Sequence, residues 1–119
     1  MVRLLVVAVL LGSVASPALA EDVVRFNAGE VAATYRPVAG AFGIGTSGLS
    51  DAACAEAVAG RLSDLAAETG LPQTLSSQGV PEDALPELAE ATLADASIIY
   101  NGRTVLGADE LLEVYRAAF

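Results

Sequence analysis

The clearest pattern along the chain is an apolar stripe at helical spacing near its centre. Its members follow one another at intervals of three, four and three residues: Ala55, Val58, Leu62 and Leu65. This spacing places the four side chains on one face of a helix. Ser50 precedes the stripe, and its hydroxyl can accept from the free backbone N–H groups of a helix start. Gly70, followed by Pro72, is typical of a helix end. The pattern therefore predicts a helix between Ser50 and Gly70.

Two further stripes predict helices in the last third of the chain. The first helix is expected to open at Pro81-Glu82-Asp83, because proline and carboxylates suit a helix start. Its apolar face would hold Leu85, Leu88, Ala89 and Leu93. The second is expected to begin at about Ala108, with an apolar face of Leu111, Leu112, Tyr115 and Phe119.

The region before the central stripe is less regular. Asn27 is interpreted as a helix cap that ends a first segment. Residues 28–41 are weakly helical, and Pro37 in their middle predicts a break or two short turns, since an interior proline costs a helix about 3 kcal/mol. Loops are expected at residues 43–48, 74–79 and 101–102, and Ile98-Ile99-Tyr100 is too short to predict a strand. The fold class predicted is all-α, a small helical bundle.

The first 22 residues form an apolar segment that admits two interpretations. Arg3 precedes an apolar run at residues 4–14, and Ala18-Leu19-Ala20 then leads to Glu21-Asp22. This order of basic start, apolar centre and small residues is typical of a secretory signal peptide. The alternative is the remnant of a buried alanine-rich helix, which periodicity cannot distinguish. The run is too short for a stable membrane span. Residues 23–119 are then the expected helical domain.

Composition limits the partners and the chemistry. The chain has 119 residues, 15 carboxylates, six arginines, no lysine and a net charge of -9. Such a charge argues against nucleic acid and against an anionic membrane surface, and it favours solubility. Histidine is absent, and Cys54 is the only cysteine, so an internal disulfide is excluded.

Two features could suggest a binding loop or a nucleophile. Gly43, Gly45 and Gly48 have the spacing of a nucleotide-binding glycine loop, but the segment before them looks helical, whereas such a loop follows a strand. We therefore expect an inter-helix loop. Cys54 lies in the first turn of the central helix, where a thiol can become reactive. Without a histidine as base, we interpret it as a small buried hydrophobe.

Two polar groups remain as candidates for ligand contact. Glu82, Asp83, Glu87 and Glu90 could form a loose carboxylate group on one helix, although such a surface is usually only solvated. The turn Tyr100-Asn101-Gly102-Arg103 could touch a ligand, and a plain turn is the simpler interpretation. We assign no catalytic, cofactor-binding or metal-binding residue to this chain.

The last half of the sequence resembles the end of the iron-containing alcohol dehydrogenases. The resemblance is carried by residues 79–91 (GVPEDALPELAEA), 93–95 (LAD), 98–103 (IIYNGR) and 111–118 (LLEVYRAA), preceded by Leu71-Pro72. Residues 24–28 (VRFNA) resemble the segment that follows the metal-site helix of the same family. The match is closest over residues 70–118 and looser over residues 23–69, with the order and spacing kept.

The resemblance implies a C-terminal helical domain of a larger enzyme. Members pair it with a nucleotide-binding α/β domain, bind iron or another divalent metal through an aspartate and three histidines, and move hydride between NAD(P) and an alcohol or aldehyde. Counting back from Phe26-Asn27, the last metal histidine would fall near Gly12, which cannot coordinate metal. Leu106 stands where a capping Asp or Thr is usual, which would weaken the last helix by about 1 kcal/mol.

Three hypotheses about function follow from these patterns. The first is a truncated member of the family, inactive alone; the second is a small exported helical binding or structural module; the third is half of a split dehydrogenase completed by a nucleotide-domain partner. The family resemblance implies the cytoplasm, and a working signal in residues 1–20 would imply export. Self-association is expected through apolar surface that missing partners would leave uncovered, with Leu62 and Leu65 or Leu85 and Leu93 as candidates.

Overall fold

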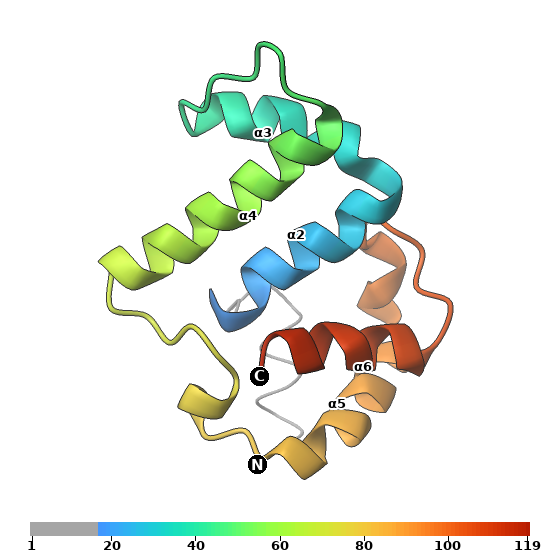
Figure 1. Ribbon diagram of the computed structural model, residues 1–119. Coiled ribbons are helices and arrows are strands. Elements are labelled where there is room, and N and C mark those ends of the chain that lie inside the picture. The colour runs from blue at the N-terminus through green and yellow to red at the C-terminus, as the bar shows by residue number, and fades with distance from the viewer. Residues whose placement is uncertain (1–16) are drawn as a thin grey trace.

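The computed structural model describes residues 17–119, which form only helices joined by loops (Figure 1). In order these are α2 (Pro17–Val31), η1 (Ala32–Thr34), α3 (Tyr35–Ala41), α4 (Asp51–Glu68), η2 (Ser76–Gln78), η3 (Glu82–Ala84), α5 (Leu85–Leu93), η4 (Ala96–Tyr100) and α6 (Ala108–Ala117). No strand occurs in this part of the chain. The predicted all-α fold is confirmed.

Helix α4 begins and ends where the sequence predicts. Ser50 has extended backbone angles, and its Oγ accepts from the Ala53 N–H at 3.1 Å. At the other end Gly70 has a φ of 69° and its N–H donates to Ala67, while the Leu71 N–H donates to Ala66 at 2.9 Å. This pair of bonds is a Schellman motif, and its left-handed residue favours glycine.

We expect Ser50→Ala to lower the free energy of unfolding by about 1 kcal/mol, because the Ala53 N–H loses its side-chain acceptor. Urea denaturation followed by circular dichroism measures the change. The control is Ser47→Ala, in the exposed loop before α4, which should leave the midpoint unchanged. Equal effects of the two substitutions would contradict the assigned cap.

The interpretation of Asn27 as a helix cap is wrong. Helix α2 runs without interruption from Pro17 to Val31, across the expected boundary between residues 22 and 23. Asn27 lies inside this helix and is only 7% exposed. Its side chain accepts a hydrogen bond from Asn101 instead of capping the local backbone, a contact between residues far apart in sequence. Residues 1–16 of the expected apolar segment lie outside the described residues, so both interpretations of that segment stay predictions.

The break expected near Pro37 is present, and it falls just before the proline. The 3-10 turn η1 separates α2 from α3. Pro37 is then the third residue of α3, where its missing N–H would have had no partner within the helix.

Two hydrophobic clusters fill the interior of the part formed by residues 17–119. The first contains Ala18, Leu19, Leu75, Leu85, Leu88, Ala89, Leu111, Tyr115 and Ala118. The second contains Val24, Ala39, Cys54, Val58 and Ala59. Helix α4 packs on α2 and α3, whereas α5 packs on α6, so Figure 1 shows α2 between the two groups of helices. Helix α2 thus contributes to both clusters, Leu19 to the first and Val24 to the second.

The leucines expected to be uncovered are mostly covered. Leu85 is 2% exposed in the first cluster, and Leu93 packs against the same cluster. Leu62 packs against the second cluster, and Leu65 is half-buried. The prediction for Leu85 is therefore wrong, because α6 packs on α5 and Leu85 lies in the same cluster as Leu111 and Tyr115 of α6. Among the described residues, the most exposed large apolar side chains are instead Ile99 (75%), Tyr100 (85%) and Leu106 (82%).

Helix α6 starts at Ala108, as its apolar stripe predicted, so its cap lies one residue later than the resemblance indicated. Gly107 is its N-cap and provides no side-chain bond. The Glu110 carboxylate instead reaches back and accepts from the Leu106 N–H at 2.8 Å. Asp109 and Glu110 also place negative charge in the first turn, which favours the positive end of the helix. This arrangement offsets part of the expected weakening. Within the described residues, no helix is long and apolar enough to cross a membrane.

Candidate functional site

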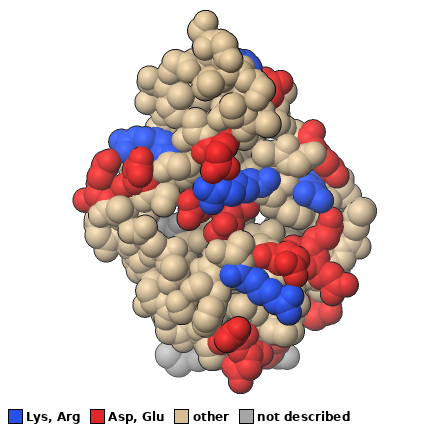
Figure 2. Space-filling model, in the orientation of Figure 1, with Lys and Arg blue, Asp and Glu red and all other residues tan. Residues whose placement is uncertain are grey.

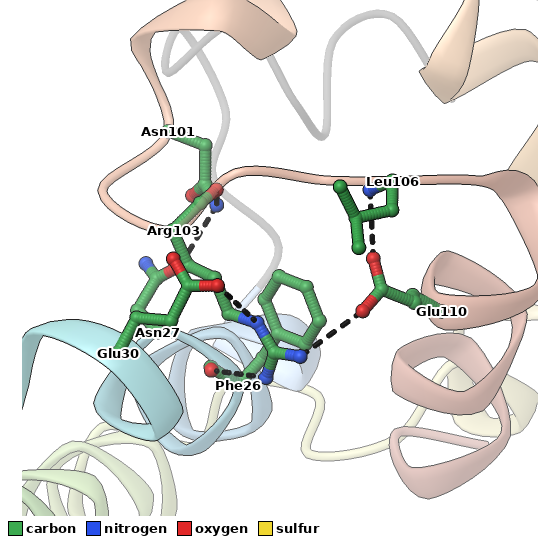
Figure 3. A network of polar contacts seen from close by, with 7 residues as sticks. All are labelled: Phe26, Asn27, Glu30, Asn101, Arg103, Leu106 and Glu110. Atoms are coloured by element: carbon green, nitrogen blue, oxygen red, sulfur yellow. Dashed lines mark hydrogen bonds and ion pairs between the residues drawn. The ribbon is translucent and has the colours of Figure 1, made fainter.

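A network of polar contacts joins α2 to the loop before α6 and to α6 itself (Figure 3). We call this set the α2–loop joint, and it consists of Phe26, Asn27, Glu30, Asn101, Arg103, Leu106 and Glu110. At its centre the Arg103 guanidinium donates to the Phe26 carbonyl at 3.1 Å and to Glu110 Oε1 at 3.0 Å. It also lies 4.2 Å above the centre of the Phe26 ring, a cation–π contact. One side chain thereby binds two helices.

A second link in the joint is formed by two asparagines. Asn101 Nδ2 donates to Asn27 Oδ1 at 2.8 Å and to the Arg103 carbonyl at 2.7 Å. Two glycines lie where the loop and the helix approach each other. A Cβ on Gly29 would stand 2.8 Å from Arg103 Nη1, and one on Gly102 would stand 3.4 Å from Val31 Cγ2. The close fit therefore depends on glycine at position 29, on the helix side, whereas a Cβ at position 102 would make an ordinary van der Waals contact.

The chemistry open to the joint is binding and positioning. The guanidinium provides only hydrogen-bond donors, while the Glu110 carboxylate already accepts from Arg103 and Leu106. Glu30 Oε1 lies 3.8 Å from Arg103 Nε, an ion pair without a hydrogen bond. Among the residues that the structure describes, no three His, Cys, Asp or Glu side chains group closely enough to hold a metal ion.

A second charged group ties α2 to α4. The Arg25 guanidinium donates to Glu56 through Nε at 3.0 Å and through Nη2 at 2.8 Å. It also lies 3.2 Å from Glu21 and 3.8 Å from Asp22. The hydrogen bonds from Arg25 lower the pKa of Glu56. Figure 2 shows the same pattern more widely, because on the face it displays blue groups lie next to red ones and form no broad basic patch.

Asp22 differs from Glu56 in the direction of its shift. Burial, with the adjacent Glu21 charge, raises the pKa of the Asp22 carboxyl, and Arg25 opposes the shift. Between the ordinary aspartate pKa and this raised value the folded chain binds more protons than the unfolded chain. Stability due to Asp22 therefore falls as pH rises through that window.

We expect Asp22→Asn to raise the free energy of unfolding at neutral pH by a fraction of a kcal/mol and to remove that decline with pH. Urea midpoints measured from neutral to mildly acidic pH test this. The control Asp64→Asn removes the same charge from an exposed position on α4. A gain from Asp64→Asn as large as that from Asp22→Asn would show that total charge, and not burial, is responsible.

The glycine loop has a structural explanation. It follows α3, a helix, and Gly43 closes that helix with a φ of 76°. The Gly43 N–H donates to Gly40 and the Ile44 N–H donates to Ala39, which is a second Schellman motif. Gly48, with a φ of 79°, is the third residue of a turn closed by the Leu49 N–H and the Thr46 carbonyl. The glycine spacing thus serves a helix end and a turn.

Cys54 is fully buried in the second cluster beside Val58 and Ala59. The interpretation of this residue as a small buried hydrophobe is confirmed.

The acidic candidates do not come together. Glu82 and Asp83 line an open hollow with Leu85, Pro86, Leu112 and Arg116. Glu87 and Glu90 are exposed elsewhere on α5.

The turn at residues 100–103 does more than the simpler interpretation allowed, since it supplies Asn101 and Arg103 to the α2–loop joint. Sequence reasoning missed their partners Asn27, Glu30 and Glu110. Asn27 and Asn101 are 74 residues apart, and no sequence pattern around either asparagine indicates that the two form a hydrogen bond. The signal that was present is the polar Asn-Gly-Arg run, which stands in a largely apolar chain.

Comparison with known proteins agrees with this architecture. Residues 12–119 match the Fe-containing alcohol dehydrogenase family, C-terminal. The 1,3-propanediol dehydrogenase of Citrobacter freundii is 33% identical over 106 residues, which cover 89% of this chain and 27% of that protein. A solved structure of 1,3-propanediol oxidoreductase superposes with a TM-score of 0.85 at 28% identity, covering 98% of this chain and 31% of the other.

The chain therefore spans less than a third of the length of these two relatives. The match covers the helices described above and includes α2 and the residues of the joint. This chain belongs to the Fe-containing alcohol dehydrogenase family, and its helices correspond to the C-terminal domain of that family.

Proposed function

We propose that this chain is a helical domain of the alcohol dehydrogenase type that has no dehydrogenase activity by itself. The observation that carries the proposal is the complete lack of histidine in a sequence that matches a metal-dependent family. The family resemblance implies three histidine ligands, the last of which would fall near Gly12. Without nitrogen ligands, carboxylates alone hold iron or zinc weakly.

The test is an activity assay of the purified full chain with ferrous iron, NAD and 1,3-propanediol, the alcohol named in the two relatives. The Citrobacter freundii enzyme, assayed alongside, controls for the conditions. We expect no formation of reduced cofactor above the rate without protein. Turnover that scales with the concentration of this chain and stops on addition of a chelator would overturn the proposal.

A second candidate function is one half of a split dehydrogenase. It is favoured by the small share of the relatives that the chain covers and by the exposed side chains of Ile99, Tyr100 and Leu106. Such apolar exposure is typical of a surface that contacts a partner. The test is co-purification with a separately encoded nucleotide-binding protein from the same genome, followed by the same assay. Activity that is found when the two proteins are mixed, and in neither protein by itself, would support the split enzyme.

Export of the chain is disfavoured by the packing at the start of α2. Cleavage after Ala20 would remove Ala18 and Leu19, which are buried in the first hydrophobic cluster. We therefore propose that the chain keeps these residues and stays in the cytoplasm. N-terminal sequencing of the protein made by its own host decides the matter. A mature protein that starts at Glu21 would support the exported module instead.

We expect salt to promote self-association of the isolated chain. The net charge of -9 keeps copies apart, but this repulsion is screened beyond about 8 Å at physiological salt. Sedimentation at low and high salt measures the effect. Tyr100→Ser should reduce association, whereas Leu71→Ser, at a half-exposed position elsewhere, should reduce it less. A monomer at both salt concentrations would contradict the expectation.

A further inference from the structure

Asn101 and Gly102 form the dipeptide that is most prone to spontaneous deamidation. In this reaction the backbone nitrogen of the following residue attacks the side-chain amide carbon, and glycine offers no side chain to hinder the approach. The chain has one other asparagine, Asn27, which is followed by Ala28 inside helix α2. Any loss of side-chain amide from asparagine can therefore be assigned to one of two positions.

In the folded chain the Asn101 side chain is held away from this reaction. Its amide nitrogen donates to Asn27 Oδ1 and to the Arg103 carbonyl, so rotation toward Gly102 breaks two hydrogen bonds (Figure 3). The extended ψ of 143° at Asn101 also keeps the Gly102 nitrogen out of the plane that a five-membered ring needs. Gly102 itself is exposed, and within the described residues its N–H makes no hydrogen bond.

We propose that Asn101 is a deamidation site that the α2–loop joint holds unreactive and that reacts when the joint opens. The Gly102 nitrogen attacks Asn101 Cγ, the C–N bond to Nδ2 breaks, and Nδ2 leaves as ammonia, which takes up the proton lost by Gly102. The product is a cyclic imide. One water molecule then opens either carbonyl of the ring, giving aspartate or isoaspartate at position 101.

The product cannot restore the joint. A carboxylate accepts hydrogen bonds and does not donate them, so it has nothing to offer the Arg103 carbonyl, which lies 2.7 Å from the amide nitrogen in the intact chain. Isoaspartate in addition adds a methylene to the main chain between Asn101 and Gly102. Deamidation would therefore turn a reversible opening of the loop into a permanent one.

The experiment incubates the full chain at mildly alkaline pH, once folded and once unfolded in urea, and follows each asparagine by peptide mapping and isoaspartyl methyltransferase labelling. We expect Asn101 to react at least about tenfold more slowly in the folded chain, because reaction then needs local opening. Asn27 should lag behind Asn101 in urea. Equal rates for Asn101 in both states would contradict the proposal that the joint protects it. An Asn101 that stays unreacted in urea would contradict the proposal that it is a deamidation site.

Two variants separate the joint from the chemistry. Asn27→Ala removes the acceptor and should speed the reaction of Asn101 several-fold in buffer while leaving the rate in urea unchanged; Ser47→Ala, outside the joint, should change neither. Circular dichroism confirms that the Asn27 variant is folded.

Gly102→Ala should slow the reaction several-fold in urea, and an unchanged rate there would refute attack by the residue 102 nitrogen. If Asn27→Ala is unfolded, the folded and urea rates of Gly102→Ala still test protection, and equal rates would refute it.

Discussion

Leu85→Ala is expected to lower the free energy of unfolding by about 2–5 kcal/mol, the range found for leucine truncations in protein cores. Leu85 is 2% exposed and lies in the first hydrophobic cluster between α5, α6 and the start of α2. Truncation removes apolar contacts within this cluster and leaves a cavity that the packed helices fill only in part. Since whole domains have stabilities of roughly 5–15 kcal/mol, the variant should be close to unfolding at room temperature.

Urea denaturation followed by circular dichroism measures this effect. The matched control is Leu106→Ala, which makes the same chemical change at a side chain that is 82% exposed. We expect the control to shift the midpoint little. If both substitutions have the same small effect, the first cluster does not stabilise the fold as its burial indicates.

Arg103→Ala is expected to lower the free energy of unfolding by about 2–3 kcal/mol. The charged donor of several hydrogen bonds is lost, and their acceptors keep no protein partner in its place. The substitution removes the donors to the Phe26 carbonyl and to Glu110, and it removes the cation that lies between the Glu30 and Glu110 carboxylates. Arg103→Lys should restore only part of the loss, since a lysine ammonium is a compact point charge and lacks the wide planar fork through which the guanidinium reaches the Phe26 carbonyl and Glu110 with separate nitrogens.

Arg116→Ala provides the control for loss of a positive charge. Arg116 pairs with Glu113 one turn earlier on α6, and both side chains are exposed. Such pairs contribute about 0–1 kcal/mol. Hydrogen exchange at the amides of α2 and of residues 101–106 would localise the Arg103 effect. A loss of stability for Arg103→Ala no larger than that for Arg116→Ala would mean that the joint is not important for stability.

The sequence predicted those parts of the fold that depend on neighbouring residues. Ser50 and Gly70 mark the ends of α4 because a cap and a left-handed glycine act within one turn. Pro37 predicts a break because proline lacks the N–H that would donate to a carbonyl one turn earlier in the same helix. The sequence could not predict that Asn27 lies inside α2, because the partner that satisfies its side chain is Asn101, which only the tertiary fold brings near.

The same reason explains what could be predicted of the candidate site. The absence of histidine is a property of the sequence, so the lack of a family-type ligand set could be stated without a structure. The α2–loop joint could not be predicted from the sequence, because its two sides come from residues 26–30 and 101–110, which only the fold brings together. Exposure of apolar side chains was also misjudged for Leu85, since a helical stripe shows which face is apolar and not which neighbour covers it.

Helix α2 contributes Leu19 to one core and Val24 to the other. Neither group of helices is therefore complete without it. A gene cut in the connector between α4 and α5 would give one product that keeps α2. The other product would hold α5 and α6 without the α2 side chains that complete the first hydrophobic cluster. The smallest piece of this fold that can be inherited, transferred or fused as a unit is thus the whole span from α2 to α6. Recombination among enzymes of this family should exchange that span intact, with crossovers placed outside it.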